Sequence, residues 1–152
     1  MREILFRGKT DTGRWVYGDL MQTQILFRCK TDKGRWMRGD LLRKPQHDVY
    51  SIVEQKEDME YYLVDKNTIG QYTGLTDKNG TGIFEGDILK IVDDEGNTDF
   101  SDGGVGNVEF AYGLWYVSGK PQNGLWDLLQ AYYCEVLGNI YDNPELLKGA
   151  EK

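Results

Sequence analysis

Apolar and polar residues alternate near the N-terminus of the chain, and the same pattern occurs there twice. Residues 4–9 and 14–20 alternate, and the turn Thr10-Asp11-Thr12-Gly13 separates them. Because strand side chains repeat every two residues, this pattern predicts a β-hairpin over residues 4–20. The pattern returns over residues 25–41, with 13 of the 17 aligned residues identical. We therefore expect tandem hairpins, neither of which can bury its apolar face alone.

The rest of the chain predicts further strands and one helical turn. Residues 126–133 fit either one face of a helix or a strand. The sequence Asn143-Pro144-Glu145 combines an N-cap residue, a first-turn proline and an acid, which predicts a short C-terminal helical turn through about Leu147. The predicted strands occupy residues 49–53, 61–64, 69–75, 83–92, 105–110, 114–117 and 135–141.

The segment Phe84-Glu85-Gly86-Asp87-Ile88 lies at the start of a β run in the middle of the chain. Its pattern, an apolar residue, any residue, Gly-Asp and another apolar residue, is typical of small SH3-like barrels. The glycine permits a sharp bend, and the aspartate can accept backbone N–H groups. We therefore predict an all-β, mainly antiparallel fold. It has a small SH3-like or related β-barrel over residues 69–141, tandem N-terminal hairpins and a short C-terminal helical turn. The length of 152 residues favours a single domain over residues 1–152.

The net charge of −7 conceals two regions of opposite sign. Residues 1–50 carry a formal charge of +5, and residues 51–152 carry −12. A basic head on an acidic body favours head-to-tail self-association or a basic face turned to a partner, although an uneven scatter of surface charge is the plainer interpretation. Cys29 and Cys134 do not make a disulfide framework, and no apolar run approaches the roughly 20 residues of a membrane helix. We expect a cytoplasmic protein without a membrane partner.

Basic residues interleave with aromatic residues in both predicted hairpins. A β-ribbon with this pattern can contact phosphates and stack on bases. The competing interpretation, which we prefer, places Trp15 and Trp36 in the core with solvated arginines beside them, because large aromatics usually carry burial and the whole chain is acidic. The candidate interaction residues are Arg14, Trp15, Arg28, Lys33, Arg35, Trp36 and Arg38.

The patterns that would carry catalysis or metal binding are weak. His47 is the only histidine and lies in a polar loop, so Cys/His zinc sets and triads built from several histidines lack residues. Residues 77–88 copy the first half of a calcium-binding loop but place Ile88 where a bidentate glutamate is required. The acidic loop 93–102 is more typical of a solvated hairpin end than of a metal site. We expect no enzyme, no catalytic or metal-binding residues and no cofactor.

Five phrases along the chain are specific enough to suggest a family. They are Arg2-Glu3-Ile4 with Phe6-Arg7, Trp15-Val16-Tyr17-Gly18-Asp19-Leu20, Thr68-Ile69-Gly70-Gln71-Tyr72-Thr73-Gly74-Leu75-Thr76-Asp77-Lys78-Asn79-Gly80, Ile83-Phe84-Glu85-Gly86-Asp87-Ile88 and Glu135-Val136-Leu137-Gly138-Asn139-Ile140-Tyr141-Asp142-Asn143-Pro144-Glu145-Leu146. Together they resemble the YopX family of phage and prophage proteins. The resemblance implies a mainly β fold, homo-oligomers and expression in the cytoplasm of a bacterial host, but no known activity. A member of that family normally has one N-terminal segment, whereas this chain has two.

Three functional hypotheses follow from the repeat, the charge and the weak catalytic patterns. The first is a non-enzymatic phage or prophage protein that self-associates or binds a host protein. The second is a nucleic-acid-binding module that uses the basic N-terminal hairpins, with a variant in which the acidic body imitates DNA for a basic host protein. The third, a metal-dependent enzyme using loop 93–102, ranks last.

Overall fold

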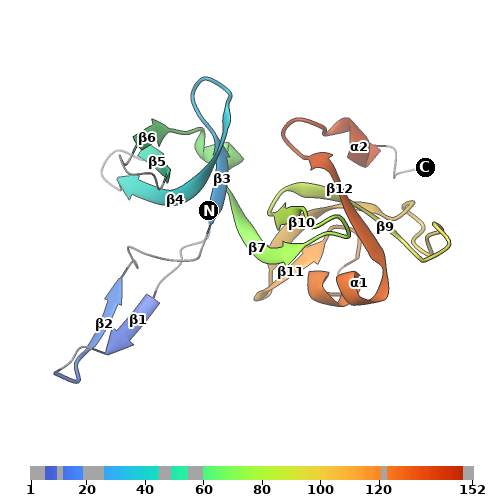
Figure 1. Cartoon of the computed structure of the whole chain (residues 1–152), viewed down its shortest axis with the longest axis horizontal. Helices are drawn as coiled ribbons and strands as arrows, with labels where there is room; N and C mark the ends of the chain where they lie inside the picture. Colours follow the sequence, from blue (N-terminus) through green and yellow to red (C-terminus); the bar gives the residue numbers. More distant parts are fainter. Residues whose placement is uncertain are drawn as a thin grey trace.

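The computed structural model describes residues 6–9, 12–18, 26–44, 49–54, 60–120 and 123–148, so the predicted loop around His47 lies outside the described residues. Within them the chain is dominated by β-strands (Figure 1). The elements in chain order are β1 (Phe6–Lys9), β2 (Trp15–Gly18), β3 (Phe27–Lys30), β4 (Trp36–Lys44), β5 (Val49–Glu54), β6 (Glu60–Leu63), the 3₁₀ turn η2 (Lys66–Thr68), β7 (Gly70–Thr76), β8 (Gly82–Phe84), β9 (Asp87–Val92), β10 (Val105–Ala111), β11 (Leu114–Val117), α1 (Leu125–Ala131), β12 (Tyr133–Asn139) and α2 (Glu145–Lys148).

The described strands form two open antiparallel sheets and one separate hairpin. The six-stranded sheet has the order β6-β5-β4-β3-β7-β8, and the four-stranded sheet has the order β11-β10-β9-β12. The first hairpin, β1–β2, projects from one end of the molecule, at the lower left of Figure 1. The prediction of a mainly antiparallel β fold with tandem hairpins is confirmed. The predicted small SH3-like or related β-barrel over residues 69–141 is not observed as a closed barrel, because β7 pairs with β3 and β8 while β9 to β12 form a different, open sheet.

Gly86 carries the chain from one sheet to the other. Its φ of +88° is a conformation that residues with a side chain rarely adopt. Its N–H donates to the carbonyl of Val108, and its own carbonyl accepts from Ile140, both at 2.9 Å. The next residue, Asp87, accepts the N–H of Phe84 at 2.8 Å. The predicted bend at Gly86 and the predicted backbone contact of Asp87 are therefore confirmed, but the bend separates two sheets instead of closing one.

The larger apolar core lies between the four-stranded sheet and α1. Leu125 and Leu128 lie on one face of α1 and are buried with Leu89 and Ile91 of β9. Of the two alternatives for residues 126–133, the helix is observed over most of the range, because α1 continues to Ala131 and β12 begins only at Tyr133. The predicted C-terminal helical turn is confirmed as α2. No helix in the described parts of the chain is both long and apolar enough to cross a membrane.

The second hairpin, β3–β4, is built into the six-stranded sheet. Its β3 pairs with β7, and its β4 pairs with β5. Cys29 and Met37 lie opposite each other across the hairpin and pack on Ile52 of β5, and all three side chains are buried. The second copy of the repeat therefore occupies the place inside the sheet, and the first copy stays outside it.

Candidate interaction surface

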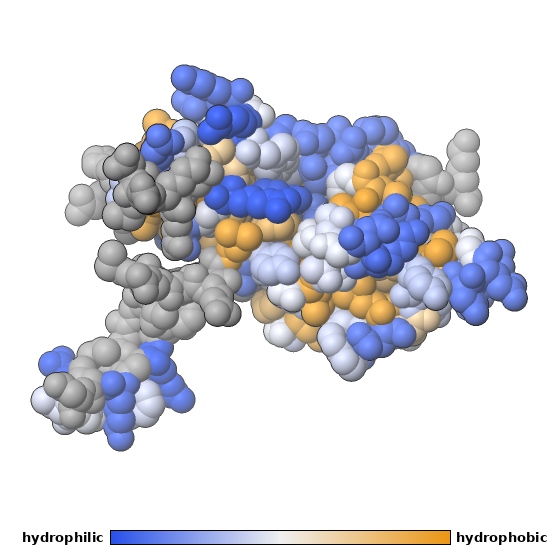
Figure 2. All heavy atoms as spheres, in the orientation of Figure 1, coloured by the Kyte–Doolittle hydropathy of each residue, from blue (hydrophilic) through white to orange (hydrophobic). Residues whose placement is uncertain are grey.

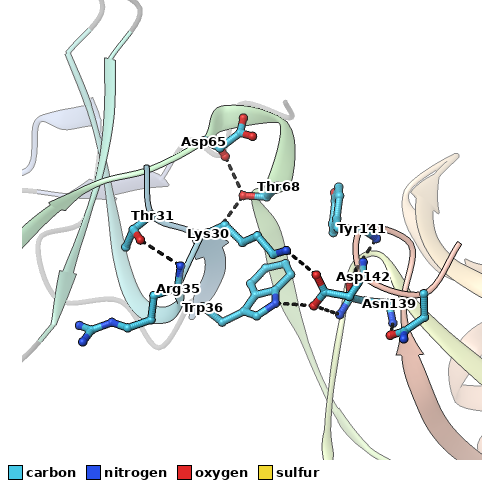
Figure 3. Close-up of polar contacts among 10 residues, drawn as sticks. Lys30, Thr31, Arg35, Trp36, Asp65, Thr68, Asn139, Tyr141 and Asp142 are labelled. Atoms are coloured by element: carbon cyan, nitrogen blue, oxygen red, sulfur yellow. Dashed lines mark hydrogen bonds and ion pairs between the residues drawn. The ribbon is translucent and has the colours of Figure 1, made fainter. Parts of the chain in front are cut away.

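A clasp of charged and aromatic side chains joins the second hairpin to the turn that follows β12. Lys30 Nζ forms an ion pair with Asp142 Oδ1, and Trp36 Nε1 donates a hydrogen bond of 2.7 Å to Asp142 Oδ2 (Figure 3). The ring of Trp36 also packs against Tyr141, with ring centroids 5.9 Å apart. One carboxylate thus receives a cation and an aromatic N–H from the same hairpin.

The clasp residues share one face of the hairpin because strand side chains alternate. Arg28 and Lys30 flank Cys29 along β3, and Lys30 lies directly opposite Trp36 on β4. The opposite face carries Cys29 and Met37, which enter the core. The second hairpin therefore has a core face and a charged face. We call Arg28, Lys30 and Trp36 on the charged face the second triad.

Arg28 binds a buried carboxylate at the start of β9. Its Nη2 lies 2.6 Å from Asp87 Oδ1, and only 12% and 1% of the two side chains are exposed. The guanidinium also lies over the rings of Trp36 and Phe84, at 5.0 and 4.8 Å from their centroids. Burial raises the pKa of Asp87, although the charge of Arg28 opposes this shift. Removal of Arg28 would therefore leave a buried carboxylate without its main counter-charge.

Local hydrogen bonds hold the turn that presents Asp142. Asn139 Oδ1 accepts the N–H groups of Tyr141 and Asp142, both at 3.0 Å, and Asn139 Nδ2 donates to Asp142 Oδ2 at 3.3 Å. Hydrogen bonds from Lys30 and Trp36 lower the pKa of Asp142 to about 2. The carboxylate is therefore ionised throughout the physiological pH range and is already oriented toward the hairpin.

The first hairpin carries the same three side chains at the corresponding positions. Arg7, Lys9 and Trp15, which we call the first triad, match the second triad residue for residue, and Lys9 again pairs with the tryptophan across the strands. Arg7 and Lys9 lie 5.1 and 5.6 Å from the ring centroid of Trp15, against 5.0 and 5.3 Å in the second triad. All three side chains are exposed, Trp15 by 51%, and neither cation forms an ion pair with another described residue. The first triad is thus assembled in the same way, but among the described residues it has no counterpart of the carboxylates that the second triad binds.

The structure separates the predicted interaction residues into three groups. The preferred prediction that both tryptophans lie in the core with solvated arginines is wrong, because the core face of the hairpin belongs to Cys29 and Met37. Trp15 is exposed, Trp36 is half-buried at the clasp, and Arg28 is almost fully buried. Arg28, Trp36 and Arg38 line a groove of about 490 Å³ beside Asp142, Lys33 and Arg35 belong to the turn region of the second hairpin, and Arg14 and Trp15 belong to the first hairpin.

The acidic half of the clasp, Asp87 and Asp142, was not predicted from the sequence. Asp142 lies in a phrase that indicated only the family resemblance, and Asp87 was predicted only to accept backbone N–H groups at a bend. Neither is near the hairpins along the chain. Lys30 could have been found, because it alternates with Arg28 and faces Trp36 in the predicted hairpin register. The carboxylates could not, because one sequence does not show which distant charges meet.

In the described part of the chain, the carboxylate of Asp77 has a structural role, because it accepts backbone hydrogen bonds. Burial raises the pKa of Asp77, but the N–H groups of Val136, Thr81 and Asn79 outweigh this and lower it. Residues 77–88 therefore form a hydrogen-bonded turn followed by β8 and the start of β9. Within the described ranges, no three His, Cys, Asp or Glu side chains are grouped as metal ligands.

The fold and the clasp define a two-sheet, mainly antiparallel β protein tied together by a charged hairpin. The chain belongs to the YopX family, because the family model described as "YopX protein" matches residues 5–148. The crystal structure of protein EF1440 from Enterococcus faecalis is similar, with a TM-score of 0.54 and 24% sequence identity, over 83% of this chain and 99% of that chain. This likeness shows the fold. The comparison with curated proteins found no match.

Proposed function

We propose that this YopX family protein is a non-enzymatic interaction module whose first hairpin binds a carboxylate-bearing partner protein. One observation carries the proposal: the first triad repeats, in exposed form, a face that binds carboxylates elsewhere in the same chain. Because the two hairpins are nearly identical, the ligands of the second triad indicate the chemistry that the first triad selects.

The differences between the two hairpins support this assignment. Four of the 17 aligned positions differ, and none of them belongs to the triads. Two of the four place Gly8 and Val16 where the second hairpin has the buried Cys29 and Met37. Smaller side chains fill a core less well, so the first hairpin is poorly suited to the sheet but keeps the triad, with Tyr17 where the second hairpin has Arg38.

The test uses the four indole N–H signals of the protein in nitrogen-labelled NMR spectra. The probe is a peptide with the sequence of residues 137–146, which contains the turn around Asp142. We expect the Trp15 signal, assigned with the Trp15→Phe variant, to move as the peptide is added. A peptide in which asparagine replaces that aspartate should have little effect, because the carboxylate provides the charge-assisted contacts.

Two variants separate the first triad from general charge attraction. The Arg7→Ala/Lys9→Ala chain should lose the response, whereas Lys33→Ala/Lys148→Ala, which removes two cations elsewhere, should keep it. An unchanged Trp15 signal at saturating peptide would contradict the proposal.

A nucleic-acid-binding function is the second candidate, because exposed Trp15 between two cations is also suited to stack on a base beside phosphates. The overall charge of −7 opposes it. Titration with a single-stranded oligonucleotide decides between the two. Nucleic-acid binding predicts that the logarithm of the binding constant falls linearly with the logarithm of the salt concentration and that binding depends on Arg7 and Lys9. A response to the peptide without a response to the oligonucleotide would exclude this candidate.

A further inference from the structure

An acidic and aromatic groove lies beside α1, far from the first hairpin along the molecule. Its volume is about 830 Å³, and its walls include Trp126 of α1 and Tyr133 of β12. These side chains are 59% and 53% exposed, which is high for large aromatics. The groove also contains Asp93 and Asp94 from the loop after β9, and Lys78, whose Nζ forms an ion pair with Glu135 at 2.9 Å. The described surface therefore offers carboxylates and exposed rings at one place.

The two aspartates have different roles in this loop. Asp93 accepts the N–H groups of Glu95 and Asn97 and so shapes the turn. Asp94 is exposed and forms no hydrogen bond or ion pair with another residue in the described ranges. Asp94 is therefore the carboxylate that is available to a ligand.

The groove matches the environment that the second triad already binds. In the clasp, a carboxylate, Asp142, lies next to an aromatic ring, Tyr141, and the hairpin contacts both. In the groove, Asp94, Trp126 and Tyr133 all contribute to the lining. A cation of the first triad would meet the carboxylate, and Trp15 would meet the exposed rings.

The first hairpin of the same chain does not fill this groove. Figure 1 shows β1–β2 at the opposite end of the molecule from α1 and from the loop after β9. Figure 2 shows the described atoms of that hairpin as a hydrophilic projection from the rest of the surface. The basic element and the acidic groove are thus presented in different directions, as a contact between two molecules requires.

We propose that the partner of the first hairpin is a second copy of this chain, which receives the first triad in the groove at Asp94, Trp126 and Tyr133. This inference rests on the proposed function and names its partner. Donor and acceptor are different surfaces, so the contact is heterologous: each added copy presents another unused hairpin and another unused groove. The assembly grows as an open head-to-tail chain or closes into a ring, and salt weakens it because oppositely charged surfaces attract.

Sedimentation velocity tests the association directly. At low salt the mean sedimentation coefficient should rise with protein concentration to values beyond those of a dimer, and added salt should return it toward the monomer. A protein that stays monomeric at its highest soluble concentration in low salt would overturn the inference.

Mixing two variants tests the head-to-tail geometry. The chain with Arg7→Ala/Lys9→Ala/Trp15→Ala keeps its groove, and the chain with Asp94→Ala/Trp126→Ala keeps its hairpin. Each should be monomeric alone, and the mixture should form a one-to-one dimer and nothing larger, because a single intact contact remains. All substituted side chains are exposed, so unchanged thermal melting should confirm that both variants fold. A mixture that stays monomeric while the unmodified chain associates would overturn the proposed contact.

Two further results separate this inference from the proposed function. The Lys33→Ala/Lys148→Ala chain loses the same charge as the Arg7→Ala/Lys9→Ala pair and should still associate. Loss of association in this control would overturn the inference, because net charge alone would then explain it. A monomeric protein whose Trp15 signal still responds to the peptide would refute the second copy as partner and leave the proposed function standing.

Discussion

The two hairpins of this protein have nearly the same sequence but very different surroundings. The second lies between β5 and β7 inside a sheet, and the first stands apart. The sheet has one such place, and Cys29 and Met37 fill the core behind it better than Gly8 and Val16 would. We attribute the placement to these two core-facing positions. The triads are identical in the two hairpins, although the charged face carries Arg38 in the second hairpin and Tyr17 in the first. The comparison teaches that a duplicated segment can lose its fit to a core and keep its binding chemistry.

Replacing the arginine of each triad should give the largest difference in the free energy of unfolding between the two hairpins. Arg28→Met should lower the free energy of unfolding by about 3–5 kcal/mol, because Asp87 stays buried without its counter-charge. Arg7→Met should change it by less than about 0.5 kcal/mol, because Arg7 is exposed. Chemical denaturation near pH 7 measures both. Equal effects would refute the structural difference between the triads.

The same pair of variants predicts a pH dependence. The pKa of Asp87 is already raised in the folded protein, and loss of Arg28 should raise it further. A carboxyl group with a raised folded-state pKa binds protons more strongly when folded, so lower pH stabilises the folded state through it. The loss of unfolding free energy in Arg28→Met, relative to the unmodified chain, should therefore become smaller as the pH falls toward the acid range. A deficit that grows on acidification would contradict this account of Asp87.

Exchanging the core positions tests why the second copy occupies the sheet. Cys29→Gly/Met37→Val gives the second hairpin the core face of the first and should cost about 2–3 kcal/mol, from lost packing and from glycine in a strand. The reverse change, Gly8→Cys/Val16→Met, should leave the unfolding free energy within about 0.5 kcal/mol. Denaturation midpoints provide the comparison. If the reverse change stabilises the protein strongly, the first hairpin already packs in a core.

Asp142→Asn tests the clasp at the C-terminal turn. At neutral pH the variant should be less stable by about 1 kcal/mol or less, since the pair is partly exposed. The folded-state pKa of Asp142 is about 2, below its ordinary value of 3.8. Its contribution is therefore complete above pH 4 and is lost as the pH falls from about 4 to about 2. The free energies of unfolding of Asp142→Asn and the unmodified chain, measured against pH, should converge between about pH 4 and about pH 2. A constant difference between them would argue against an ionised carboxylate in the clasp.

Deleting residues 4–24 has the smallest expected effect on stability. The second hairpin keeps its contacts with β5 and β7, so the melting temperature should stay within a few degrees of the original. Binding of the peptide should be lost, because the first triad is removed. A large drop in melting temperature would show that the first hairpin supports the body.

Local features of the fold were predictable from the sequence, and the division into sheets was not. The alternation around Arg14-Trp15 and Arg35-Trp36 located both hairpins, and the residues around Gly86 indicated a bend. These signals depend on neighbouring residues alone. The pairing of β3 with β7 depends on contacts across many residues, so the residues after Ile69 were wrongly assigned to one barrel.

The candidate site shows the same limit. The triads could be located because they lie within single hairpins, but their burial could not be predicted. Trp15 and Trp36 have the same sequence neighbours on one side, yet within the described ranges only Trp36 donates to a carboxylate. The difference comes from Asp142, about a hundred residues away. The structure was therefore needed to show that the second triad binds carboxylates and that the first triad is exposed.

The position of the two native thiols has a practical consequence for labelling. Burial raises the pKa of Cys29 to about 12 and that of Cys134 to about 11, and both side chains are almost fully enclosed. The thiolate is the form that attacks alkylating reagents, so both cysteines should be inert in the folded protein at neutral pH. A single Thr12→Cys substitution at the exposed tip of the first hairpin would then take up a fluorophore alone. Fluorescence energy transfer from or to that label could then measure the position of the hairpin tip.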